Sequence, residues 1–189
     1  MKILTKDEVN VNKGVILEVI KNGAIFVYPT DTIYGIGCNA RLSAAVKKIR
    51  KLKQRPDTPF SIIAPSKEWI ADHCIVSKKA KEWINKLPGP YTLILKTKKH
   101  AAVKEVAPGL GTLGIRIPDN WFADIVKQLK IPVVTTSANI SGEDFMTSLE
   151  DLSDEIKNNI EFIIYEGEKK ASPSKLIDLT GKEAVVKER

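Results

Sequence analysis

The sequence is short of cysteine, of histidine and of long apolar runs, and each shortage excludes a class of protein. Its 189 residues include two cysteines and two histidines. Two cysteines give no disulfide framework, and the spacing of Cys38, His73, Cys74 and His100 fits no zinc finger. No apolar run approaches the roughly 18 residues of a membrane span, and residues 1–8 lack the apolar stretch of a signal peptide. We therefore expect a cytoplasmic protein with no resident metal and no membrane partner.

Arginine is also scarce, although the chain is basic. The net charge is +7, and only five of the 30 basic residues are arginines. A basic balance favours anionic partners such as nucleotides, RNA or phosphates. Widely scattered lysines mostly form a solvated surface, whereas arginine suits bidentate contacts with carboxylates and phosphates. Each arginine is therefore a candidate binding residue: Arg41, Arg50, Arg55, Arg116 and Arg189.

One glycine pattern has a familiar meaning but stands in the wrong context. Residues 109–114 match the G-x-G-x-x-G pattern of dinucleotide-binding proteins, which must follow a strand and open a helix. Here a strand over 112–117 follows instead, so we interpret the glycines as a turn. The chain has no P-loop motif, and His100 lies in a lysine-rich stretch that suits no Ser-His-Asp triad. Any nucleotide must therefore be bound by another device.

Helical and strand patterns alternate along the chain. The periodicity predicts helices over 5–22, 43–53, 121–130 and 149–157, with two more that begin after Ser66 and Ser77. Strands are predicted over 24–28, 60–64, 91–95, 112–117, 132–136, 162–165, 176–179 and 184–187. This interleaving predicts an α/β or mixed α+β fold around one sheet, in a single domain that spans residues 1–189.

Polar residues follow the first buried strand at the point where Pro29 must end it. Thr30, Asp31 and Thr32 stand between that strand and a second apolar stretch, Ile33–Gly37. The mouth of a buried strand is where α/β proteins place ligands. A turn that is held by local hydroxyl-to-backbone bonds explains the same residues, and the sequence alone leaves both readings open.

Cations, hydroxyls and an amide gather at other segment edges, and Asp31 is the nearest carboxylate. This inventory suits a polyanion together with a small polar molecule, and does not indicate acid–base hydrolysis. Taken singly, each residue fits a cap or a solvated surface equally well. The residues in question are Lys53, Arg55, Thr112, Arg116, Thr135, Ser137, Asn139, Ser141, Ser174 and Arg189.

Six segments together resemble the YrdC-type family, the threonylcarbamoyl-AMP synthases. They occur in the family's order and span almost the whole chain, which makes the set far more specific than any one motif. The segments are YPTDTIYGIG (28–37), KLKQRP (51–56), LPGPYTLILK (87–96), GTLGIRIP (111–118), VVTTSANISG (133–142) and SPSKLIDLTG (172–181).

This resemblance implies a YrdC-like twisted sheet with a large, positively lined central cavity. It implies a nucleotidyltransferase that converts L-threonine, bicarbonate and ATP to threonylcarbamoyl-AMP and pyrophosphate, with Mg²⁺ accompanying ATP. A downstream threonylcarbamoyl-transferase complex would then modify adenosine 37 of tRNA, which makes tRNA a candidate partner.

By matching position, the resemblance also implies residue roles. Lys53, Arg55 and Arg116 are the expected catalytic residues, and Arg116 should hold the threonine carboxylate with Thr32 and Thr135 lining the pocket. ATP should be bound by Lys53, Arg55, Thr58, Thr112, Ser137, Asn139, Ser174 and Arg189. The chain departs from the family pattern at Gln54, Thr58, Ile63, Phe145 and Lys175, which affects the expected nucleotide and threonine contacts.

Two other functions remain open from the sequence. One is a carbamoyl-adenylate transfer module like the related domain of hydrogenase maturation proteins, which normally belongs to a much longer chain. The other is a tRNA- or double-stranded-RNA-binding, translation-associated protein, which the charge of +7 would fit. The chain shows no aromatic stacking platform of the kind that RNA-recognition modules use.

Overall fold

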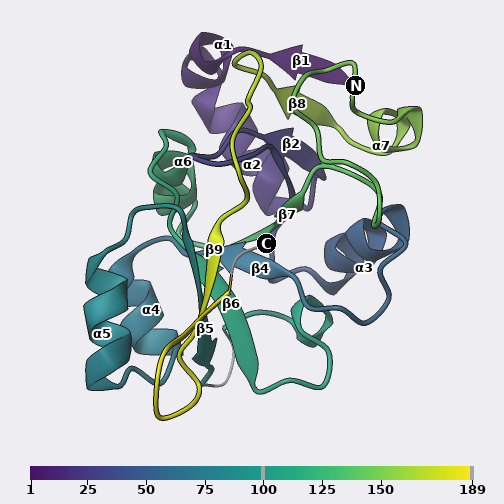
Figure 1. The fold of residues 1–189 in the computed structure, drawn as a ribbon. Coiled ribbons are helices and arrows are strands. Elements are labelled where there is room, and N and C mark those ends of the chain that lie inside the picture. The colour runs from purple at the N-terminus through teal and green to yellow at the C-terminus, as the bar shows by residue number, and fades with distance from the viewer. Residues whose placement is uncertain (99–100, 188–189) are drawn as a thin grey trace.

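The computed structural model describes residues 1–98 and 101–187. These residues form a strongly twisted mixed sheet with helices packed on it (Figure 1). The strands are β1 (Lys2–Leu4), β2 (Phe26–Tyr28), β3 (Gly35–Gly37), β4 (Ser61–Ile63), β5 (Tyr91–Lys96), β6 (Thr112–Arg116), β7 (Val133–Ser137), β8 (Phe162–Ile164), β9 (Lys175–Asp178) and β10 (Val185–Lys187). The helices are α1 (Lys6–Val11), α2 (Lys13–Lys21), α3 (Ser43–Leu52), α4 (Lys67–His73), α5 (Lys78–Asn85), α6 (Phe122–Leu129) and α7 (Asp154–Asn158), and a 3₁₀ helix, η1, covers Lys104–Val106.

The sheet order is β1-β8-β2-β3-β7-β4-β6-β5-β9-β10. Strands β4 and β6 run parallel, whereas β7 runs antiparallel to both β3 and β4. The centre of the sheet therefore brings together strands that are far apart in the sequence. The predicted α/β class with a twisted sheet is confirmed.

Alternate residues of the central strands enter two separate cores, because side chains alternate across a pleated strand. In β2, Phe26 and Tyr28 pack with α2 and α6, whereas Val27 joins the larger core beneath α3, α4 and α5. Ile62 and Ile63 of β4 divide in the same way. Burial on both faces explains why these strands read as continuous apolar runs.

The structure differs from the sequence prediction in several elements, among them β3, which the sequence marked only as an apolar stretch, and η1. The predicted first helix is broken at Asn12 into α1 and α2, so Val11 and Val15 are 84% and 64% exposed instead of facing the core. The predicted helix over 149–157 shortens to α7, which Ser153 caps. Strand β1 was not predicted, because three residues are too few to show a periodic pattern. It forms by parallel pairing with β8, which lies far away in the sequence.

Other local predictions hold. Thr5 and Glu8 form the capping box of α1, and the side chains of Ser66 and Ser77 cap α4 and α5. The glycine-rich stretch before β6 leads into that strand and not into a helix. Within the described residues, no helix is long and apolar enough to cross a membrane.

Candidate active site

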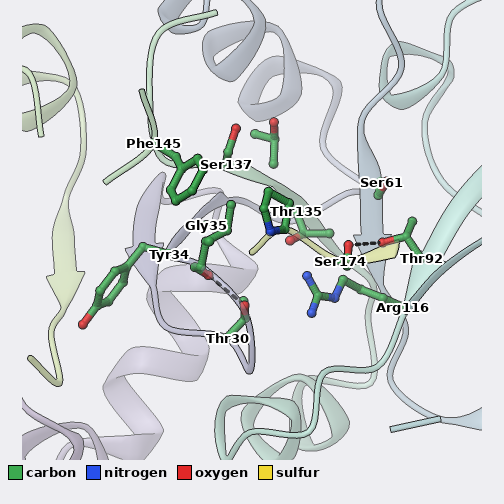
Figure 2. Close-up of a pocket in the computed structure, with 13 residues that line it drawn as sticks. Thr30, Tyr34, Gly35, Ser61, Thr92, Arg116, Thr135, Ser137, Phe145 and Ser174 are labelled. Atoms are coloured by element: carbon green, nitrogen blue, oxygen red, sulfur yellow. Dashed lines mark hydrogen bonds between the residues drawn. The ribbon is translucent and has the colours of Figure 1, made fainter. Parts of the chain in front are cut away.

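A small pocket with both polar and apolar lining lies at the centre of the sheet, where β3, β4, β5, β6 and β7 meet (Figure 2). Its volume of about 130 Å³ is well below that of a typical drug-sized ligand site, so it is suited to a small molecule. Hydroxyl groups and one guanidinium supply most of its polar lining. The lining residues are Thr30, Ile33, Tyr34, Gly35, Ser61, Thr92, Arg116, Thr135, Thr136, Ser137, Phe145, Pro173 and Ser174.

Arg116 is the cation of this pocket and is only 5% exposed. Its Nη2 pairs with the carboxylate of Asp31, and its two Nη atoms donate to Thr32 Oγ1 at 3.2 and 3.3 Å. The other carboxylate oxygen of Asp31 accepts from the backbone of Asp119 at 3.0 Å. Burial lowers the pKa of Arg116, and the Asp31 carboxylate opposes that shift.

The Nε atom of Arg116 is buried and has no hydrogen-bond partner among the described residues. In Figure 2 its guanidinium points toward Thr30 and Ser174. A buried charged donor without an acceptor is costly, and an anionic ligand would remove that cost. The pocket is therefore suited to a small carboxylate.

The hydroxyl groups around Arg116 are held by one another and by the backbone. Thr92 Oγ1 and Ser174 Oγ lie 2.8 Å apart, and the Thr30 hydroxyl donates to the Ile33 carbonyl at 2.7 Å. Thr30 Oγ1 also accepts from the Thr32 backbone at 3.1 Å. Residues 30–32 thus form a locally bonded turn and also contribute to the pocket, because the bonds that close the turn place Thr30 there.

A second, more open depression lies between the end of α3 and the turn after β7. It is rich in cations and amides, and Ser137 lines both it and the first pocket. Its lining residues are Lys53, Gln54, Arg55, Pro56, Thr58, Ser137, Asn139, Ser141 and Gly142. The two hollows therefore meet at the end of β7.

Lys53 connects the two walls of this second depression. Its Nζ donates to the carbonyls of Ser137 and Asn139, each at 2.7 Å, and to Asn139 Oδ1 at 3.1 Å. The Lys53 carbonyl in turn accepts from the Ser141 backbone at 3.2 Å. Lys53 is 1% exposed, and burial, with repulsion from Arg55, lowers its pKa to about 7.

Some residues predicted from the sequence line the first pocket, some line the second depression, and the others line neither. Arg116, Thr135, Ser137 and Ser174 line the first pocket, and Lys53, Arg55, Thr58, Ser137 and Asn139 line the second. Thr32 accepts hydrogen bonds from Arg116 and does not line either hollow. Thr112 lies at the far end of β6 and lines a separate hollow with Lys98 and Lys104, and Arg189 lies outside the described residues.

Thr30, which the sequence analysis placed at a strand mouth, lines the pocket, whereas prediction from the sequence missed Ser61 and Thr92. Ser61 and Thr92 reach the pocket because β4 and β5 flank β6, with Ser61 opposite Gly114. That adjacency depends on the strand order, which the sequence does not reveal. Ile63, a departure from the family pattern, is buried in the same core cluster as Phe122 and does not line the pocket.

A strap formed by residues 165–174 runs from β8 to β9 and brings Pro173 and Ser174 to the pocket. Figure 1 shows it crossing much of the molecule. Tyr34 fastens it, because the Tyr34 hydroxyl donates to the Gly167 carbonyl at 2.6 Å and accepts from the Glu166 backbone at 3.1 Å. Burial raises the pKa of Tyr34 to about 12, so the phenol stays protonated at neutral pH.

Tyr34→Phe should loosen this strap without unfolding the protein. The change leaves two partly buried backbone groups without their partner, at a cost of about 1–3 kcal/mol. We expect faster amide hydrogen exchange over 165–172 and a lower melting temperature. Tyr165→Phe is the matched control, since it keeps the ring that stacks on Tyr34 at 5.7 Å. Unchanged exchange in the Tyr34 variant would show that the strap is held by other contacts.

The described residues contain no cluster of three or more His, Cys, Asp or Glu side chains that could hold a metal ion. Neither hollow is lined by a carboxylate. Any divalent cation at this site would therefore depend on a ligand for its oxygen donors, as Mg²⁺ commonly does with nucleotide phosphates.

Comparison with known proteins gives consistent results. A sequence model of the Sua5/YciO/YrdC family, described as telomere recombination, matches residues 18–188. A protein of Methanocaldococcus jannaschii called putative threonylcarbamoyl-AMP synthase is 40% identical over 172 residues, which cover 87% of this chain and 80% of that protein.

Two solved structures share the fold. The crystal structure of Pyrococcus abyssi Sua5 complexed with L-threonine superimposes with a TM-score of 0.86 at 30% identity, and covers 98% of this chain and 56% of its own. Escherichia coli YciO, an uncharacterized protein, also gives 0.86 at 25% identity, over 100% of this chain and 94% of its own. The chain thus spans about half of the Sua5 chain and nearly all of YciO. By sequence and by fold, this chain belongs to the Sua5/YciO/YrdC family.

Proposed function

We propose that this protein is an L-threonylcarbamoyl-AMP synthase, which converts L-threonine, bicarbonate and ATP to threonylcarbamoyl-AMP and pyrophosphate. One observation carries the proposal: a small hydroxyl-lined pocket with a buried arginine adjoins a cationic depression, and Ser137 belongs to both. An amino acid and a polyphosphate bound in these two hollows would meet at the end of β7.

The first pocket matches threonine in charge and in size. Arg116 offers a buried donor to the carboxylate, and the hydroxyls of Thr30, Thr92 and Ser174 are candidates to bind the substrate hydroxyl. A site built from hydrogen-bonding groups rejects an analogue that lacks the matching group, because its own polar atoms are then left unpaired. We therefore expect valine, which has a methyl in place of the hydroxyl, to be a very poor substrate.

The second depression matches the triphosphate of ATP. Lys53 and Arg55 provide positive charge there, and Ser137 and Asn139 provide polar groups. Side chains with these donors stabilise the charge that develops during transfer of a phosphoryl or nucleotidyl group. Mg²⁺ enters this proposal as part of the Mg²⁺–ATP substrate, since neither hollow supplies a carboxylate ligand.

The chemistry needs positioning more than acid–base catalysis. The threonine amine and bicarbonate combine with loss of water to give a carbamate. A carbamate oxygen then forms a bond to the α-phosphorus of ATP, and the bond to the bridging oxygen breaks so that pyrophosphate leaves with the electron pair. Holding the two anions together despite their repulsion is the main task of the site, and Arg116, Lys53 and Arg55 supply the opposing charge.

The proposal is tested with purified protein, ATP, Mg²⁺ and bicarbonate, with and without L-threonine. Pyrophosphate release is followed over time, and threonylcarbamoyl-AMP is sought by mass spectrometry. Threonine-dependent product supports the proposal, and valine is the matched control substrate. Dependence on carbamoyl phosphate would instead indicate a carbamoyl-adenylate module. ATP binding without any turnover, together with tight binding of tRNA, would indicate an RNA-binding protein.

The wider partners are part of the same proposal. The adenylate product is a mixed anhydride, so a downstream transferase must consume it before water does. We infer that this transferase delivers the threonylcarbamoyl group to adenosine 37 of tRNA. Direct tRNA binding by this chain and its cytoplasmic location remain predictions.

A further inference from the structure

Arg50 in α3 is buried and lines neither hollow. It is 8% exposed. Its Nη1 donates to the carbonyls of Arg55, Pro56 and Thr58 at 2.8, 2.8 and 3.2 Å. Its Nε and Nη2 donate to the carbonyls of Glu105 and Val106, at 2.6 and 3.2 Å. One side chain thus joins the 54–58 loop to the 3₁₀ helix η1.

The 54–58 loop needs such a constraint, because its backbone turns sharply where α3 ends. Gln54 has a φ of +51°, a left-handed conformation that favours glycine. Arg55 then folds back so that its N–H donates to the Arg50 carbonyl at 3.0 Å. A non-glycine residue in this region is strained and persists only when its surroundings hold it.

Arg50 and Arg55 also share an aromatic support. The guanidinium carbons of Arg50 and Arg55 lie 4.5 and 5.4 Å from the centroid of the Phe60 ring, which is buried. Arg55 Nη2 donates to the Pro59 carbonyl at 2.9 Å. The place of the Arg55 head group is therefore set by the same loop that Arg50 holds.

The hydrogen bonds of Arg50 also orient the dipoles of the loop. Three loop carbonyls point to Arg50, which does not line the cationic depression. Their negative ends are thereby drawn away from the place where an anion would lie. Freed from Arg50, these carbonyls would be able to turn into the depression and repel a polyphosphate.

We propose that Arg50 is the positioning residue of the nucleotide side of this site, which fixes the 54–58 loop and, through it, Arg55 and Thr58. This inference rests on the proposed function, because it takes the occupant of the depression to be the triphosphate of ATP. Arg50 itself contacts no substrate in this assignment.

The test is Arg50→Lys in the full chain. Lysine keeps a positive charge but has a single nitrogen, which cannot reach the loop and η1 carbonyls together. Calorimetry should show an ATP affinity, with Mg²⁺ present, that is lower by about 10- to 100-fold, because a misplaced binding group loses most of its contribution. The affinity for threonine should stay within about twofold, and amide hydrogen exchange over 54–60 should become faster.

A double-mutant cycle separates positioning from general destabilisation. If Arg50 acts through Arg55, Arg50→Lys should weaken ATP binding far less in an Arg55→Ala background than in the wild type. Asn39→Ala is the matched control, because Asn39 is equally buried, binds the Lys21 carbonyl at 2.9 Å and lines neither hollow. That control should lower the melting temperature and leave ATP affinity unchanged.

Any one of three results on ATP binding would overturn the inference: wild-type ATP affinity in Arg50→Lys, additive losses in the cycle, or an equal loss of affinity in Asn39→Ala. Failure of the proposed function looks different, since the wild-type protein would then bind no ATP. Hydrogen exchange over 54–60 needs no nucleotide, so unchanged exchange in Arg50→Lys would still refute the positioning role.

Discussion

Arg116→Ala is expected to lower kcat/KM for threonine by about 30- to 150-fold while ATP still binds. This range corresponds to about 2–3 kcal/mol, the contribution of a hydrogen bond from a charged donor to a carboxylate. The reason is geometric: Arg116 Nε is a buried donor without a described partner, and the pocket around it offers hydroxyls but no second cation. Steady-state kinetics with varied threonine, and calorimetry with ATP, measure the two effects separately.

Asp31 forms a buried ion pair with Arg116, so Arg116→Ala leaves the Asp31 carboxylate unpaired. Removing one member of a buried ion pair costs about 3–5 kcal/mol of stability, because the other charge is left unpaired. Asp31→Asn/Arg116→Ala removes both charges and should fold better than the single variant, with the same loss of threonine turnover. Arg41→Ala is the control, since Arg41 is exposed and lines neither hollow. Normal threonine kinetics in the double variant would move the carboxylate site away from Arg116.

Lys53→Met should weaken ATP binding by about 10- to 150-fold. The variant loses the ammonium charge, and it leaves the Ser137 and Asn139 carbonyls without their donor. Hydrogen bonds from charged groups contribute about 1.5–3 kcal/mol each, and the turn after β7 loses its link to α3 as well. Added salt should weaken ATP binding to the wild type more than to the variant, because an electrostatic contribution has been removed.

The pH dependence follows from the pKa of Lys53. Burial lowers it from 10.5 to about 7, so the ammonium is charged below that pH and loses its proton above it. ATP affinity of the wild type should therefore fall between pH 6.5 and 8.5 relative to Lys53→Met, which shares the ionisation of ATP but lacks the titrating amine. In the unfolded chain the amine keeps its proton to higher pH, so the wild type should gain stability as pH rises above 7, and the variant should lack that gain.

Lys51→Met is the control for both experiments, because Lys51 is exposed in the last turn of α3, two residues before Lys53, and lines neither hollow. It should change neither the ATP affinity nor its pH dependence by more than about twofold, as is usual for an exposed lysine. If Lys53→Met bound ATP as well as the wild type, the phosphates would have to lie outside the second depression.

The sequence by itself determined the local elements and the family. Caps, breakers and apolar periodicity act over a few residues, so Ser66, Ser77 and the strand ending at Pro29 are visible without a structure. The six ordered motifs indicated the family, and Arg116, Thr135, Ser137 and Ser174 do converge on one pocket. The broken first helix shows the limit of periodicity, because the pattern continues across Asn12 whereas the chain does not.

Only the tertiary structure decided which of these residues are neighbours and which protein groups each one contacts. The placement of β6 between β4 and β5 brings Ser61 and Thr92 to Arg116, and puts Thr112 at the other end of the strand in a different hollow. The sequence marked Arg50 as one of five candidate binding arginines, and only the fold shows that its side chain donates to five backbone carbonyls. Such contacts join residues that are distant in the sequence, such as Arg50 with Val106 and Tyr34 with Gly167. Their formation depends on strand order and burial, which local sequence patterns do not encode.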